Sequence, residues 1–241
     1  KKIRALLLKD VAFAVEVPSE TSLKRIFDRC GWTSKRTRRK HQEGGRISSD
    51  ERAKSNNDVW TVDFKGWWRT GDKERCEPLT VRDENSRYML SAQPMARSDT
   101  ATVKAAFEKL FERYGLPMSI RSDNGSPFAS SNGLLGLSRL SVWWLSLGIS
   151  LKRGRPGKPQ DNGGHERMHR DIAAEVQACA QGTLAEQAAA LEMWRETFNT
   201  VRPHESLGMK TPAEVYTPSE RKYEGTPHDI VYPGMISRRV N

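Results

Sequence analysis

The chain has 241 residues, which is enough for one sizeable domain with small appendages. Its 40 lysines and arginines exceed its 30 aspartates and glutamates, and the resulting formal charge of +10 predicts a polyanionic partner, nucleic acid before membrane. A mean hydropathy of −0.72 and the absence of any long apolar run exclude a membrane-spanning helix. The three cysteines are far apart, which indicates a reducing compartment and argues against a disulfide framework or a structural zinc site.

The first 40 residues predict a small helical unit. Two short helices are expected, the second beginning at Pro18-Ser19 and ending at Gly31. We interpret residues 1–40 as a helix-turn-helix-like DNA-binding unit with Lys24 and Arg25 facing outward, although a plain helical hairpin fits the same residues.

A basic, polar stretch follows. Its arginines Arg36, Arg38 and Arg39 stand in a run that suits contact with phosphates, although such runs are often merely solvated. Residues 41–56, which include Gly44-Gly45, are predicted to be a flexible basic linker.

The central part of the chain alternates strands and helices. Strands are expected at residues 59–64, 77–83, 87–93, 118–122 and 149–152, and helices at residues 100–114 and 140–147. The first three strands form an antiparallel meander because turn residues separate the second from the third. The pairs Trp67-Trp68 and Trp143-Trp144 are expected to pack or to lie at the rim of the core rather than to stack on bases.

A further helix begins within residues 158–170, KPQDNGGHERMHR, with Asp161 or Asn162 as its N-cap. Glu166, His169 and Arg170 share one face of it. A second face is expected to be buried and carries Met168, Ile172, Val176 and Cys179. Taken alone, a glutamate here could be an ordinary solvated residue at a helix start.

The order of the elements is that of an RNase H-like α/β fold, a mixed five-stranded sheet flanked by helices. Asp63 ends the first strand, Asp123 follows the fourth, and Glu166 lies on the later helix. Three carboxylates so placed suit two divalent ions, Mg²⁺ or Mn²⁺, at a phosphodiester. We expect this core to span residues 57–218, followed at 219–241 by the start of a small C-terminal β domain.

Five stretches of this core resemble the DDE transposases and retroviral-type integrases, specifically bacterial insertion-sequence transposases. They are DVWTVDFKG (58–66), PLTVRDENSRYML (78–90), YGLPMSIRSDNGSPF (114–128), GRPGKPQDNGGHERMHRDI (154–172) and NTVRPHESLGMKTPAEVY (199–216). The resemblance implies that Asp63, Asp123 and Glu166 are the catalytic, metal-binding triad. It also implies binding of transposon ends and target DNA, a homo-oligomeric synapse, and strand transfer without a covalent protein intermediate.

Some expectations depart from the family pattern or compete with it. The spacing from Asp123 to Glu166 is longer than the commonest one, and Asp161 is a competing acid. Lys158, Arg167 and Arg170 surround Glu166 and are expected to contact phosphates. The chain is expected to be part of a longer transposase in the bacterial cytoplasm, associated with the nucleoid. The alternatives are an RNase H-like nuclease and a non-catalytic, transposase-derived DNA-binding protein.

Overall fold

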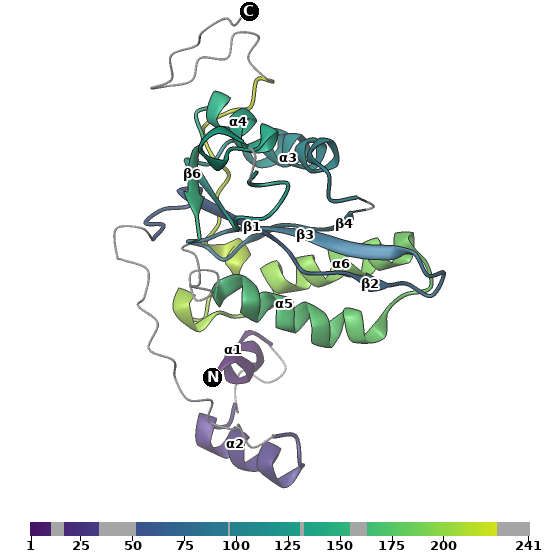
Figure 1. Ribbon diagram of the computed structural model, residues 1–241. Coiled ribbons are helices and arrows are strands. Elements are labelled where there is room, and N and C mark those ends of the chain that lie inside the picture. Colours follow the sequence, from purple (N-terminus) through teal and green to yellow (C-terminus); the bar gives the residue numbers. More distant parts are fainter. Residues whose placement is uncertain (11–16, 34–51, 96, 131–132, 155–162, 226–241) are drawn as a thin grey trace, which may run out of the picture.

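The computed structural model describes residues 1–10, 17–33, 52–95, 97–130, 133–154 and 163–225 (Figure 1). Most of the predicted basic linker and the predicted N-cap at Asp161 or Asn162 therefore lie outside the described residues. Among the described residues, no helix is long and apolar enough to cross a membrane.

One sheet organises the core. It contains β1 (Val59–Phe64), β2 (Trp68–Arg69), β3 (Arg75–Asp83), β4 (Met89–Met95), β5 (Ser119–Ser122) and β6 (Ser150–Arg153). β3 pairs antiparallel with β1 and β4, and β5 lies parallel to both β1 and β6. The mixed sheet was predicted with five strands. The sixth is the two-residue strand β2, which pairs with β3.

Helices cover both faces of the sheet (Figure 1). On one face lie α3 (Thr100–Tyr114) and α4 (Arg139–Ser146), and on the other lie α5 (Gly163–Glu175) and α6 (Leu184–Thr200). The N-cap side chains Asp99 and Thr183 accept backbone N–H bonds, which explains where α3 and α6 begin. Short 3₁₀ turns occupy Leu134–Gly136, Gln177–Cys179, Glu205–Leu207 and Pro212–Glu214.

Each face of the sheet has its own apolar core. Toward α3 and α4, alternate residues of β1 and β3 pack against aromatic rings that include Phe107 and Trp144. Toward α5 and α6, Met168 and Ile172 pack against β4 residues such as Met89. The predicted buried stripe of α5 is wrong at its last member: the helix ends at Glu175, so Cys179 lies in the following 3₁₀ turn and is exposed.

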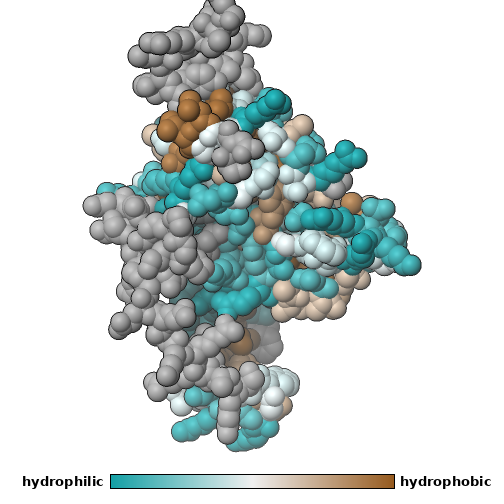
Figure 2. All heavy atoms as spheres, in the orientation of Figure 1, coloured by the Kyte–Doolittle hydropathy of each residue, from teal (hydrophilic) through white to brown (hydrophobic). Residues whose placement is uncertain are grey.

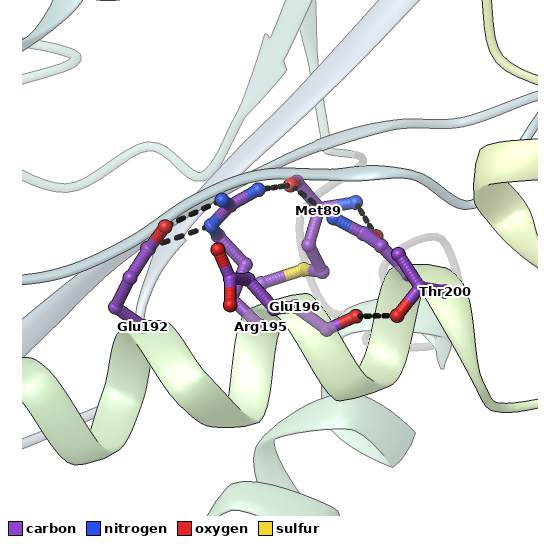
Figure 3. A network of polar contacts seen from close by, with 6 residues as sticks. Met89, Glu192, Arg195, Glu196 and Thr200 are labelled. Atoms are coloured by element: carbon purple, nitrogen blue, oxygen red, sulfur yellow. Dashed lines mark hydrogen bonds and ion pairs between the residues drawn. The ribbon is translucent and has the colours of Figure 1, made fainter.

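The outer edge of β4 is covered by polar side chains of α6. The Asn199 side chain accepts from the Met89 N–H (2.8 Å) and donates to the Met89 carbonyl (2.9 Å). Arg195 donates to the same carbonyl (3.1 Å) and is held by Glu192 (Figure 3). These bonds satisfy backbone groups that a strand edge would otherwise leave open.

The N-terminal helices are α1 (Lys2–Lys9) and α2 (Glu20–Arg29), the second capped by Ser19 as its sequence predicted. Lys9 and Glu214 form an ion pair at 3.0 Å between α1 and the core, with each side chain about half exposed. Exposed pairs of this kind contribute little, about 0–1 kcal/mol, so this contact alone does not fix the orientation of α1.

Residues 219–225 contain no strand and run along the core beside α3 and α4. The Arg221 guanidinium donates to the carbonyls of Pro117, Leu147 and Gly148, and the Tyr223 ring packs against Phe111 and Trp143. The rest of the predicted C-terminal β domain lies outside the described residues, so the division at residue 218 stays a prediction.

The most exposed large apolar side chains in the described part of the chain are Leu134 and Leu135, at 81% and 77%. Figure 2 shows one apolar patch on a face that is otherwise mostly hydrophilic. A largely hydrophilic surface agrees with the high charge content of the chain.

Candidate active site

Two of the three predicted acids lie at one edge of the sheet. Asp63 is the penultimate residue of β1, and Asp123 comes directly after β5. These strands are parallel, with Thr61 opposite Arg121, so the same register continued by two positions brings Asp123 abreast of Asp63. Neighbouring strands lie about 4.8 Å apart, and residues in equal register share a face. Asp63 is half-buried and Asp123 is exposed.

The third acid, Glu166, is exposed in the first turn of α5. A buried hydroxyl ties this helix to β1: Thr80 on β3 donates to the Asp63 carbonyl (2.8 Å), and its oxygen lies 2.9 Å from His169 Nε2. Because a hydroxyl has one proton, His169 must donate from Nε2. Glu166 and His169 are three residues apart and share a helix face, so the link to β1 lies one helical turn from Glu166.

Burial keeps His169 neutral. It lowers the pKa of this histidine to about 4, with further lowering from the charges of Lys65 and Arg82. Lys65 itself bonds to Gln177 (3.0 Å), a second tie between the end of β1 and the region of α5. A neutral His169 therefore acts as a hydrogen-bond donor to Thr80 rather than as a cation.

The turn after β5 fixes Asp123. Its carboxylate accepts from the Gly125 N–H at 3.2 Å, and a Cβ at residue 125 would stand 2.9 Å from that carboxylate. A side chain at this position would therefore displace the Asp123 carboxylate. In the described residues, no three His, Cys, Asp or Glu side chains are gathered closely enough to hold a metal ion. The three acids nonetheless supply the hard oxygen ligands that Mg²⁺ and Mn²⁺ prefer.

Comparison with known families agrees with this geometry. One family model described as an integrase core domain matches residues 53–159, and a second with the same description matches residues 147–212. The chain belongs to the integrase core family of transposases and integrases. The two matches meet between β5 and α5, so together they include Asp63, Asp123 and Glu166.

Relatives of this integrase core come from insertion elements and retroviruses. An uncharacterised protein of insertion element IS407 from Burkholderia multivorans is 27% identical over 184 residues, covering 73% of this chain and 62% of the relative. The Gag-Pol polyprotein of bovine immunodeficiency virus is 29% identical over 167 residues, covering 69% of this chain and 10% of the polyprotein. The chain thus spans less than two thirds of either relative.

Solved structures share the fold. The catalytic core domain of HTLV-2 integrase, determined with magnesium in a trimeric form, superposes with a TM-score of 0.54 at 18% identity, covering 69% of this chain and all of that one. The protein in an intasome of simian T-cell lymphotropic virus gives 0.58 at 18% identity, covering 98% and 80%. The predicted RNase H-like fold is confirmed.

The predicted DNA contacts of this integrase core fall into two groups. Lys24 and Arg25 are exposed on α2, and Arg167 and Arg170 are exposed on α5 beside Glu166. The others lie outside the described residues: Arg36, Arg38, Arg39 and Lys158. The competing acid Asp161 also lies outside them.

The sequence did not reveal that two residues are buried, namely His165 on α5 and Arg82 on β3. His165 is fully buried, and burial followed by the charge of Arg82 holds its pKa well below the usual range, so its role is structural. Arg82 is 6% exposed at the end of β3. An arginine next to the apolar run PLTV was the available signal, because a cation there must be exposed, paired or bound to something.

Proposed function

We propose that this chain is a DNA transposase that cleaves and joins transposon ends to target DNA with divalent metal ions. The observation that carries the proposal is the register of β1 and β5, which supports a shared position for Asp63 and Asp123 at one sheet edge. The Thr80–His169 link supports a place for Glu166 at the same edge.

In this proposal Asp63, Asp123 and Glu166 would hold two Mg²⁺ or Mn²⁺ ions through their carboxylate oxygens. Ions so bound supply activation of a water or 3′-hydroxyl nucleophile and stabilisation of the leaving oxygen. The protein holds these three carboxylates in place. Asp63 lies on β1 and Asp123 directly follows the neighbouring β5, whereas Glu166 lies on α5, which Thr80 of β3 links to β1.

Cationic side chains would hold the DNA at this edge. Arg167 and Arg170 flank Glu166 and are exposed, so they can reach phosphates on either side of the scissile bond. Lys158, which precedes α5 in the chain, is proposed to contact phosphates together with them. More distant phosphates are proposed to contact side chains of the N-terminal unit: Lys24, Arg25, Arg36, Arg38 and Arg39. A homo-oligomer would bring two transposon ends together.

Substitution of Glu166 tests this proposal. Glu166→Gln keeps the size of the side chain and removes the charge that a divalent ion requires. With pre-cut transposon-end DNA, plasmid target and Mg²⁺, we expect joined products from the unchanged chain and none from the variant, whereas both bind DNA equally. Glu112→Gln, on the exposed face of α3, is the matched control and should join normally.

Three other results would contradict the proposal. Normal joining by Glu166→Gln would remove Glu166 from the ligands and make Asp161 the candidate. Nicked but unjoined DNA would indicate an RNase H-like nuclease. DNA binding without any cleavage under every metal condition would indicate a non-catalytic DNA-binding protein.

A further inference from the structure

A basic pocket of about 620 Å³ lies beside the start of α5. We call it the arginine pocket and define it by six of its lining side chains: Lys2, Arg82, Arg87, Arg167, Arg202 and His204. Five of these are cations, whereas only two carboxylates, Asp171 and Glu205, line the same pocket. Four separate parts of the chain contribute the cations: α1, the β3–β4 hairpin, α5 and the segment after α6.

Two of these arginines, Arg82 and Arg87, form no ion pair in the part of the chain that the structure describes. Arg82 is almost fully buried, and its Nε has no hydrogen-bond partner among the described residues. The Nε of Arg87 is likewise buried and unpartnered.

The two carboxylates whose charges act on Arg82 already have other partners. Glu84 pairs with Arg121 at 2.8 Å, and Asp83 accepts from the Asn57 backbone and from Ser86. The charges of Asp83 and Glu84 partly offset the effect of burial on the pKa of Arg82, but neither carboxylate forms an ion pair with its guanidinium, so a further anion would stabilise it.

The backbone departs from regular strand geometry at both arginines. The register of β3 against β4 shifts between Val81 and Arg82, and a shift of this kind redirects a side chain. Arg87 has a φ of 66°, a left-handed conformation that is costly for a residue other than glycine. On the facing helix, any side chain at Gly164 would overlap the Arg82 guanidinium. The register shift, the left-handed conformation of Arg87 and the close approach of Gly164 all occur where the two arginines line the pocket.

The lining cations outnumber the lining carboxylates, so the pocket is positively charged at neutral pH. Arg202 pairs with Asp171 (3.8 Å) and Glu175, which uses one of the two lining carboxylates. Burial lowers the pKa of Arg82 to about 10, so this arginine is still charged at neutral pH. Burial also lowers the pKa of His204 to about 4, and the charge of Lys2 adds to that lowering.

We propose that the arginine pocket binds a phosphate group of a DNA strand, held by the guanidinium groups of Arg82 and Arg87. Guanidinium matches phosphate with paired N–H donors, and the N-terminus of the 13-residue α5 adds favourable dipole. Gly164 and Arg167 line the pocket and are close to Glu166 on α5. A DNA strand bound at the candidate active site would therefore pass the pocket. The choice of DNA as the source of the phosphate rests on the proposed function.

The first test measures phosphate binding without DNA or catalysis. The thermal unfolding midpoint of the unchanged chain should rise with inorganic phosphate relative to chloride at equal ionic strength. Arg87→Gln and Arg82→Met should each lose most of that rise. Arg82→Met removes an unpaired buried charge and should not itself lower stability. Arg113 is exposed on α3, on the opposite face of the sheet, and the matched control Arg113→Gln should keep the full rise in unfolding midpoint.

The second test identifies the source of the phosphate. Anisotropy with a short DNA duplex should give about tenfold weaker binding at low salt for Arg87→Gln and Arg82→Met than for Arg113→Gln. The salt dependence of log affinity should also fall by about one unit for each pocket variant.

Several outcomes would overturn the proposal. An equal response to phosphate in all three variants would mean that the pocket binds no phosphate. A lost phosphate response with unchanged DNA binding would indicate a free anion, and a changed oligomeric state with unchanged DNA binding would indicate a carboxylate of a second copy. Because neither test uses strand transfer, a failed joining assay would leave this result intact.

Discussion

Removing the Thr80 hydroxyl should loosen the link between α5 and the candidate catalytic edge. Thr80→Val keeps the shape of a fully buried side chain but deletes the donor to the Asp63 carbonyl and the acceptor for His169. The two bonds contribute about 1 kcal/mol each, and leaving the His169 N–H unpaired adds about 1–2 kcal/mol, so we expect a loss of about 3–4 kcal/mol. Urea unfolding followed by tryptophan fluorescence and far-UV circular dichroism measures it.

Thr61→Val is the matched control. Thr61 is also buried, faces the same side of the sheet, and makes one longer bond to the Arg82 carbonyl (3.3 Å). We expect that variant to lose about 1 kcal/mol or less. Thr80→Ser keeps the hydroxyl and should lose only about 1 kcal/mol for the methyl group.

The link should also matter for joining. A shift of Glu166 by about 1 Å can cost up to about 100-fold in rate, so Thr80→Val should slow strand transfer far more than it weakens DNA binding. If Thr80→Val and Thr61→Val agree within about 0.5 kcal/mol and join DNA equally, the hydroxyl does not position α5.

Three further predictions concern other parts of the chain. Asn199→Ala leaves the Met89 N–H unpaired and should lower the free energy of unfolding by about 2–4 kcal/mol in urea titration, whereas the exposed Thr200→Ala should stay within about 0.5 kcal/mol. Burial lowers the pKa of His204 to about 4 in the folded chain, against about 6.5 in the unfolded chain. Its contribution to the free energy of unfolding is therefore fully present above pH 6.5 and is lost as the pH falls toward 4. His204→Gln should remove about 1–2 kcal/mol of that pH dependence, and an unchanged stability profile would mean that the imidazole is not shielded from protons. Residues 56–225 alone should bind transposon-end and random DNA with similar affinity, and restoring residues 1–55 should restore end preference; equal preference in both would mean that the core reads the sequence.

Much of the fold is readable from local pattern. β1 and α3 begin and end where they were predicted: β-forming residues mark β1, whose first four residues are all buried, and the helical repeat of apolar residues marks α3. The two-residue β2 is too short to carry any period. Cys179 was assigned to a buried stripe because periodicity does not reveal that α5 ends at Glu175.

The site was only partly readable. The acids could be chosen from motifs and strand ends, whereas Arg82 and His165 could not be recognised as buried. Their burial depends on α5 crossing the sheet beside β3, a contact between segments far apart in the chain. The arginine pocket likewise forms only when four such segments meet, and no local sequence pattern encodes that meeting.

The position of Arg221 also constrains how the protein can be made. Synthesis proceeds from the N-terminus, so the strands and both apolar layers are complete as polypeptide before Arg221 and Tyr223 leave the ribosome. Until then the carbonyls of Leu147 and Gly148 lack their donor, and the rings of Phe111 and Trp143 lack the cover of Tyr223. A chain that ended at residue 218 would therefore lack the donor for these carbonyls and the cover of these rings, both of which residues 219–225 supply.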